Sequence, residues 1–166
     1  MVNPKLAVAL TGRSGEALEE YKKLMLKLNN EVVAAAPEDL LINTHVCRGN
    51  YHSTFFSSGA YDSVADLLFG EEYDDERSGG FAPLAKVSGD KKVVLGLVTT
   101  KTPALENKEL VINRIHEAAK YVPLDRLYLS PQCGFASCAI GNKLTEEEQW
   151  AKLKLVKEIA EEVWGE

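Results

Sequence analysis

The sequence has no apolar run that approaches the roughly 18–20 residues needed to cross a membrane. Its first ten residues also lack the apolar core and cleavage pattern of a signal peptide. Lysine and arginine never cluster beyond a pair, and the formal net charge is −6, whereas nucleic-acid binders usually carry a basic face. We therefore expect neither membrane nor nucleic acid as a partner, and the default location is the cytoplasm.

Cysteine is scarce, with only Cys47, Cys133 and Cys138. A disulfide framework in a short secreted chain usually uses an even number, whereas cysteines in a reducing cytosol are more often thiols or metal ligands. The sequence also lacks internal repeats, low-complexity segments and the nucleophile-elbow pattern of serine hydrolases. What remains is a globular composition, 45% hydrophobic and 27% charged, and 166 residues suffice for one domain with a core.

Helical and strand patterns alternate along the chain. Apolar residues at three- and four-residue steps predict helices over 15–36, 61–69, 108–121 and 145–164. Short β-rich runs predict strands at 40–47, 92–100 and 127–129, with a weak fourth strand between the second helix and residue 92. This order predicts βαβ units and an α/β fold with a parallel sheet.

The last helix has the clearest boundaries and a well-marked apolar stripe. Thr145 and Glu148 form a capping box at its start. The residues expected on its buried face are Trp150, Leu153, Val156, Ile159, Ala160 and Val163. We divide the single domain 1–166 into a leading helical segment (1–40), the strands that carry the candidate site (41–138) and this terminal helix (145–164).

The sharpest candidate site begins at His45-Val46-Cys47, which closes the predicted strand 40–47. Side chains two residues apart in a strand point to the same side, so the imidazole and the thiol should project together. Active sites of parallel α/β folds lie at the carboxyl ends of the strands. Cys133 also follows a predicted strand, and Glu72 opens an acidic run. One histidine, two cysteines and one glutamate are a donor set that suits zinc.

These residues also have structural alternatives. A His-x-Cys pair in a strand is more often part of the core, because free cysteine is among the most buried residue types. Cys138, in a segment of small residues, fits that structural role. The acidic stretch 71–77, taken alone, is typical of a solvated surface. The case for a site is that the four candidate ligands all fall at or just past the ends of successive predicted strands.

Four motifs occur in a characteristic order, at 44–50 (THVCRGN), 72–79 (EYDDERSG), 96–103 (GLVTTKTP) and 129–135 (LSPQCGF). Together they resemble the C-terminal half of the catalytic barrel in the cobalamin-independent methionine synthase family, especially its shorter methionine synthase II-like members. The resemblance runs from about residue 40 to the end of the chain. It implies the C-terminal portion of a (β/α)₈ TIM-type barrel with about four strands.

The resemblance also implies a chemistry. In that family the matching positions bind zinc, and here they are His45, Cys47, Glu72 and Cys133. A homocysteine-like thiol would bind the zinc as a thiolate, since the ion favours the deprotonated sulfur. That sulfur would take a methyl group from a donor such as a methylated folate and give methionine.

Several further residues are candidates for substrate contact. Lys101 follows a predicted strand, where it either meets an acidic substrate group or is simply solvated. Arg48 and Asn50 lie beside Cys47 and could orient substrate or ligands, as could Asp74 and Asp75 beside Glu72. Of these, Lys101 and Asp74 are the weak candidates for a catalytic role.

The chain departs from the family pattern in two ways. A (β/α)₈ barrel needs about 250 residues, so we expect a barrel that is incomplete as a single chain and that forms a homo-oligomer or pairs with a complementing half-barrel. The region before Glu72 is also compressed, so that Glu71 could be the carboxylate ligand instead.

Three functions follow as hypotheses. The first is a zinc-dependent thiol methyltransferase, or a fragment of one. The second is a catalytically inactive truncated paralogue or subunit. The third is another metal-dependent alkyl transfer whose donor is not a folate.

Overall fold

The computed structural model describes residues 4–47, 49–56, 73–74, 80–87 and 89–165. Its helices are α1 (Pro4–Thr11), α2 (Gly15–Ala34), α3 (Lys108–Ala118) and α4 (Glu146–Trp164), with short 3₁₀ turns at Ala82–Lys86 and Leu124–Arg126. Its strands are β1 (Tyr73–Asp74), β2 (Val93–Val98) and β3 (Leu127–Pro131). The predicted helix 61–69 lies outside the described residues. Among the described helices, none combines the length and apolar character needed to span a bilayer.

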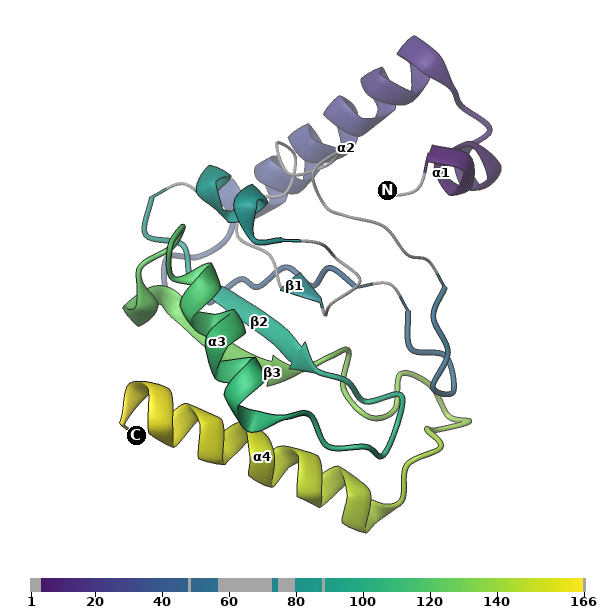
Figure 1. Ribbon diagram of the computed structural model, residues 1–166. Coiled ribbons are helices and arrows are strands. Elements are labelled where there is room, and N and C mark those ends of the chain that lie inside the picture. Colours follow the sequence, from purple (N-terminus) through teal and green to yellow (C-terminus); the bar gives the residue numbers. More distant parts are fainter. Residues whose placement is uncertain (1–3, 48, 57–72, 75–79, 88, 166) are drawn as a thin grey trace.

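The three strands form one parallel sheet in the order β1-β2-β3. Val93 of β2 pairs with Leu127 of β3, and Tyr73 of β1 pairs with Leu95. Helices α3 and α4 lie beside β2 and β3 (Figure 1). The core between them contains Val93, Leu95, Leu127, Val111, Ile115, Leu155 and Ile159. The α/β fold with a parallel sheet is therefore confirmed, and the side chains that α3 buries are Val111, Ile115 and Ala118.

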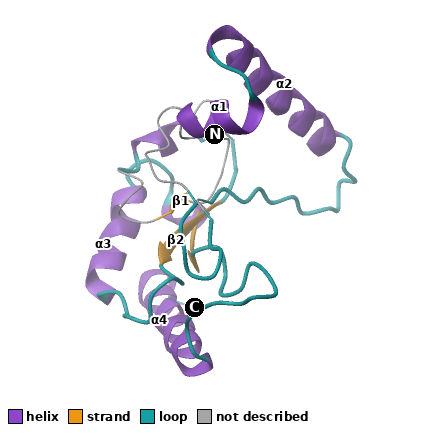
Figure 2. Cartoon of the chain, turned by 90° about the vertical axis from the view of Figure 1, so that its right-hand side faces the viewer, coloured by secondary structure: helices purple, strands orange, loops and turns teal. Residues whose placement is uncertain are grey.

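Helix α2 matches the prediction closely, but most of its apolar stripe is not buried. Leu24, Leu28 and Val32 are 49%, 43% and 72% exposed, and Leu18 is the buried residue among those described. Figures 1 and 2 show α2 standing away from the sheet and from α3 and α4. The apolar stripe predicts a helix, but the stripe is buried only if a second apolar surface packs against it. The described residues do not place such a surface there.

The predicted strand 40–47 is wrong, because residues 40–47 run as unpaired coil. Leu40 and Leu41 are 57% and 81% exposed. A β-rich sequence becomes a strand only beside a free strand edge with matching hydrogen-bonding groups, and this segment pairs with no such edge. The described residues therefore contain three strands, not the four that we expected.

Helix α4 begins as predicted. The Thr145 hydroxyl accepts a hydrogen bond from the Glu148 backbone amide at 3.3 Å, and the Glu148 carboxylate accepts one from the Thr145 amide at 2.8 Å. We expect Thr145→Ala to lower the free energy of unfolding by about 1 kcal/mol, because the Glu148 amide at the helix start loses its partner. Urea unfolding measures this, and Thr145→Ser, which keeps the hydroxyl, should behave like the wild type. An unchanged midpoint for Thr145→Ala would contradict the role of the cap.

The buried face of α4 is rotated from the predicted one. The side chains that it buries are Lys152, Leu155 and Ile159, whereas Trp150 is 59% exposed and Leu153 is only half-buried. A buried lysine was not expected from an apolar stripe. It is tolerated here because Glu106 lies opposite its ammonium group at 3.1 Å.

Candidate metal centre

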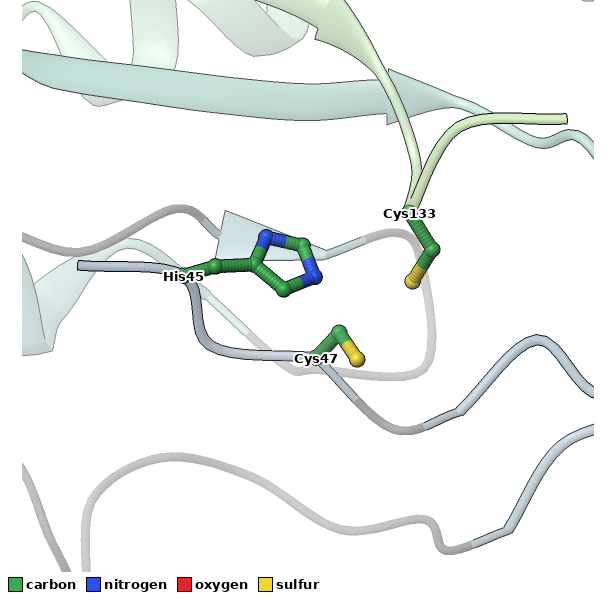
Figure 3. Close-up of side chains that lie close together, drawn as sticks. All are labelled: His45, Cys47 and Cys133. Carbon is green, nitrogen blue, oxygen red and sulfur yellow. The ribbon is translucent and has the colours of Figure 1, made fainter. Parts of the chain in front are cut away.

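Three of the four predicted ligands come together in space. His45 and Cys47 lie on the coil that follows α2, and Cys133 lies on the turn that follows β3 (Figure 3). One donor atom from each, an imidazole nitrogen and two sulfurs, all lie within 4.8 Å of one another. His45 and Cys47 are exposed and Cys133 is half-buried. The predicted strand is not needed for this convergence, since an extended segment also directs residues two apart toward one side.

The turn that carries Cys133 has an unusual backbone. Cys133 has φ of 52° and Gly134 has φ of 68°, so both are left-handed. A non-glycine residue rarely adopts this conformation. It turns the chain sharply after β3, and the Cys133 sulfur points toward His45 and Cys47 (Figure 3). A strained residue that carries a chemically useful side chain is a common feature of functional sites.

Asn50 connects the segments that carry the three residues. It is 4% exposed, and its amide nitrogen donates to the Thr100 hydroxyl at 3.0 Å and to the Gly134 carbonyl at 2.8 Å. The Ser137 hydroxyl in turn donates to the Asn50 carbonyl at 2.6 Å. Asn50 therefore ties the coil after Cys47 to the end of β2 and to the turn around Cys133.

Thr100 and Gln132 extend this network and were not singled out by the sequence. The Thr100 hydroxyl donates to the Gln132 backbone carbonyl at 2.8 Å, and the Gln132 backbone N–H donates to the Val98 carbonyl at 2.9 Å. Both side chains are buried, at 0% and 2% exposure. The available signal was their position, because Thr100 closes one predicted strand and Gln132 lies just past the end of another.

The other predicted site residues have different outcomes. Four of them lie outside the described residues, namely Arg48, Glu71, Glu72 and Asp75. The Asp74 backbone is described and pairs with Gly96 in the sheet.

Two side chains differ from expectation in their burial. Lys101 is 6% exposed, so the solvated alternative is wrong. Cys138 is exposed, so its expected burial in a structural role is also wrong. Its segment of small residues, 136–140, lies in a surface loop, where apolar composition alone does not bring burial.

The described chain has an α/β fold with a parallel sheet, and a histidine and two thiols are grouped beyond the strand ends. Together they define a protein with a candidate centre for a soft metal ion. Residues 16–162 match the family described as "Cobalamin-independent synthase, Catalytic domain". The chain therefore belongs to the cobalamin-independent methionine synthase family, a family of methionine synthase-type methyltransferases.

Individual relatives agree with this membership. The uncharacterized protein YxjG of Bacillus subtilis strain 168 is 51% identical over 159 residues, which cover 90% of this chain and 42% of that protein. The methionine synthase of Pyrococcus horikoshii is 27% identical over 93 residues, covering 56% of this chain and 26% of that protein. A crystal structure from Listeria monocytogenes, provisionally named a vitamin-B12-independent methionine synthase, matches with a TM-score of 0.67 and 39% identity over 93% of this chain and 44% of that chain. The chain thus spans less than half the length of these relatives.

Proposed function

We propose that this chain supplies the zinc-thiolate part of an enzyme that transfers a methyl group to a thiol such as homocysteine. The observation that carries the proposal is the convergence of His45, Cys47 and Cys133, in a chain of the cobalamin-independent methionine synthase family.

The donor set fits zinc. Sulfur ligands lie about 2.3 Å from zinc, so two of them on one tetrahedral ion are about 3.8 Å apart. The donor atoms here lie within 4.8 Å of one another, so a small closing movement brings all three onto one ion. Two cysteines and one histidine leave a fourth position, which Glu72 or Glu71 or the substrate sulfur would take.

Zinc bound there would hold the substrate thiol as a thiolate at neutral pH. The sulfur forms a bond to the methyl carbon while the bond between that carbon and the donor breaks. The electron pair of the broken bond stays on the donor, which takes up a proton. No electron is transferred to or from the metal, which suits zinc because it has no redox chemistry.

We further propose that the site works within a barrel to which another polypeptide segment contributes. The support is that the family relatives are more than twice as long as this chain and that the stripe of α2 is exposed. A homo-oligomer or a complementing half-barrel chain would supply that surface. Light scattering of the purified chain tests this, and a stable monomer with full methyl-transfer activity would contradict it.

Metal analysis with an activity assay tests the function. Freshly purified chain is expected to hold about one zinc per site and to produce methionine from homocysteine and a methylated folate when the barrel is complete. Zinc without activity, even in the presence of the complementing segment, would favour the inactive paralogue. Activity with a different methyl donor would favour the third hypothesis. Absence of tight zinc binding would contradict the proposal itself.

Asn50 provides a separate prediction about this site. Asn50→Ala is expected to weaken zinc binding by roughly tenfold, the low end of the effect of residues that orient ligands, because the turn around Cys133 loses its tie to the coil after Cys47. Competition with a chromogenic chelator measures the affinity. Asn30→Ala, on the exposed surface of α2, is the control and should bind zinc like the wild type. Equal affinities for both variants would show that Asn50 does not position the site.

A further inference from the structure

A cavity of about 300 Å³ lies between the end of β2 and the start of α3. Its wall includes Leu97, Thr99 and Lys101 from the chain at and after β2, and Gln132 from the turn that carries Cys133. Phe55 closes another side. Gln132 directly precedes Cys133, so one wall of the cavity belongs to the same turn as a candidate metal ligand.

Two buried polar side chains of this wall have no hydrogen-bond partner among the residues that the structure describes. They are Lys101, through its ammonium group, and Gln132, through both its amide oxygen and its amide nitrogen. Lys101 is 6% exposed and Gln132 is 2% exposed. A buried donor without a partner costs about 1–3 kcal/mol, and more when it is charged. Such groups are rare in folded proteins, and a ligand, an ordered water or an ion can supply the missing partner.

The charges around the cavity single out Lys101. Glu106 also lines the wall, but its carboxylate accepts from the Lys152 ammonium at 3.1 Å and from the Thr99 amide at 2.8 Å. Arg114 pairs with Glu117 at 2.5 Å. Within the described part of the chain, no carboxylate pairs with Lys101, and its ammonium lies 4.5 Å from the centre of the Phe55 ring.

We propose that Lys101 and Gln132 form a subsite for a carboxylate group of a substrate of the methyl transfer. The identity of the substrates in this inference rests on the proposed function. The existence of the subsite does not. The Lys101 ammonium and the Gln132 amide nitrogen donate to the two carboxylate oxygens. The volume lies at the lower limit for small-molecule sites, so it holds one acidic end of a ligand.

Phe55 is the side chain that changes when the carboxylate binds. In the free chain its ring partly offsets the charge of Lys101 through a cation–π contact, which is weaker than a buried, hydrogen-bonded ion pair. Phe55 is 37% exposed, so its ring can turn toward solvent as the carboxylate takes its place. Lys101 would then discriminate between acidic and neutral ligands.

Two pairs of probes test the subsite and separate the sources of the carboxylate. The amino-acid pair is L-methionine and 3-(methylthio)propylamine, which lacks the carboxylate. The donor pair is 5-methyltetrahydrofolate and 5-methyltetrahydropterin, which lacks the glutamate. Calorimetry on the full chain, with and without zinc, is expected to show a preference of roughly tenfold or more for the acidic member of one pair. Lys101→Met should reduce that ratio to about 1, and Lys101→Arg should keep most of it.

Lys154→Met is the matched control, because the Lys154 side chain is 77% exposed on α4, and its ratio should equal that of the wild type. The inference is overturned if neither pair shows a preference, or if Lys101→Met keeps it. It is also overturned if Lys101→Met changes only the oligomeric mass, since the carboxylate would then come from another protein chain. Zinc binding is measured on the same samples. In the wild-type chain, absence of the carboxylate preference with zinc binding intact would count against the subsite, whereas absence of zinc binding would count against the proposed function.

Discussion

Cys133→Ser is expected to lower the zinc affinity of the chain by more than about 100-fold. Removing a residue that only orients a metal ligand typically costs 10–100-fold, and removing a ligand itself should cost more. Serine keeps the size of the side chain but replaces a soft thiolate by a hydroxyl that binds zinc poorly. Cys47→Ser should have an effect of the same order, because both sulfurs belong to the same group of donors.

Cys138 provides the matched control. Like the other two cysteines it forms no disulfide, but it is exposed and lies outside the group of converging donors. Cys138→Ser should therefore keep the zinc content and the affinity of the wild type. Elemental analysis gives the content, and competition with a chelator gives the affinity. If all three serine variants lose zinc to the same extent, the cysteines act through folding or nonspecific binding, and the proposed centre is wrong.

Part of the grouping of His45, Cys47 and Cys133 could be predicted, because the relation of His45 to Cys47 depends on a local rule. Two residues in an extended segment with one residue between them point the same way, whether or not the segment pairs in a sheet. Cys133 follows β3, which pairs with the largely buried apolar strand β2, and the ends of parallel strands meet at one edge. The prediction of the strand 40–47 therefore failed without affecting the relation between His45 and Cys47, whereas their approach to Cys133 depends on the tertiary path of the coil after α2.

Burial was harder to predict because it depends on distant partners. Lys101 and Lys152 are charged residues that a sequence pattern assigns to the surface. Lys152 is buried since Glu106, 46 residues away, faces it in the folded chain. The exposed stripe of α2 shows the opposite case, where an apolar pattern meets no partner among the described residues. Periodicity identifies the helix, and the tertiary structure decides which face is covered.

Lys152→Met is expected to lower the free energy of unfolding by about 3 kcal/mol. The Lys152 side chain is 0% exposed, and its ammonium donates to the Ala104 carbonyl at 2.6 Å and to both oxygens of Glu106 at 3.1 and 3.2 Å. Removing one member of a buried pair leaves the other charge without compensation, at a cost of about 3–5 kcal/mol. Glu106 is 20% exposed, so water screens part of its charge and the low end of that range applies. Urea unfolding of Lys154→Met, at an exposed position of the same helix, should differ from the wild type by less than about 0.5 kcal/mol.

The double variant Lys152→Met/Glu106→Gln distinguishes an uncompensated charge from lost packing. Glutamine keeps an oxygen that can accept from the Thr99 amide, which now donates to Glu106 at 2.8 Å, but it carries no charge. If the charge is the main cost, the double variant should be more stable than Lys152→Met alone. Equal or lower stability would assign the loss to packing around α4. Because Thr99 precedes Thr100, which binds Asn50, loosening this loop in Lys152→Met should also weaken zinc binding, and the double variant should restore part of that affinity.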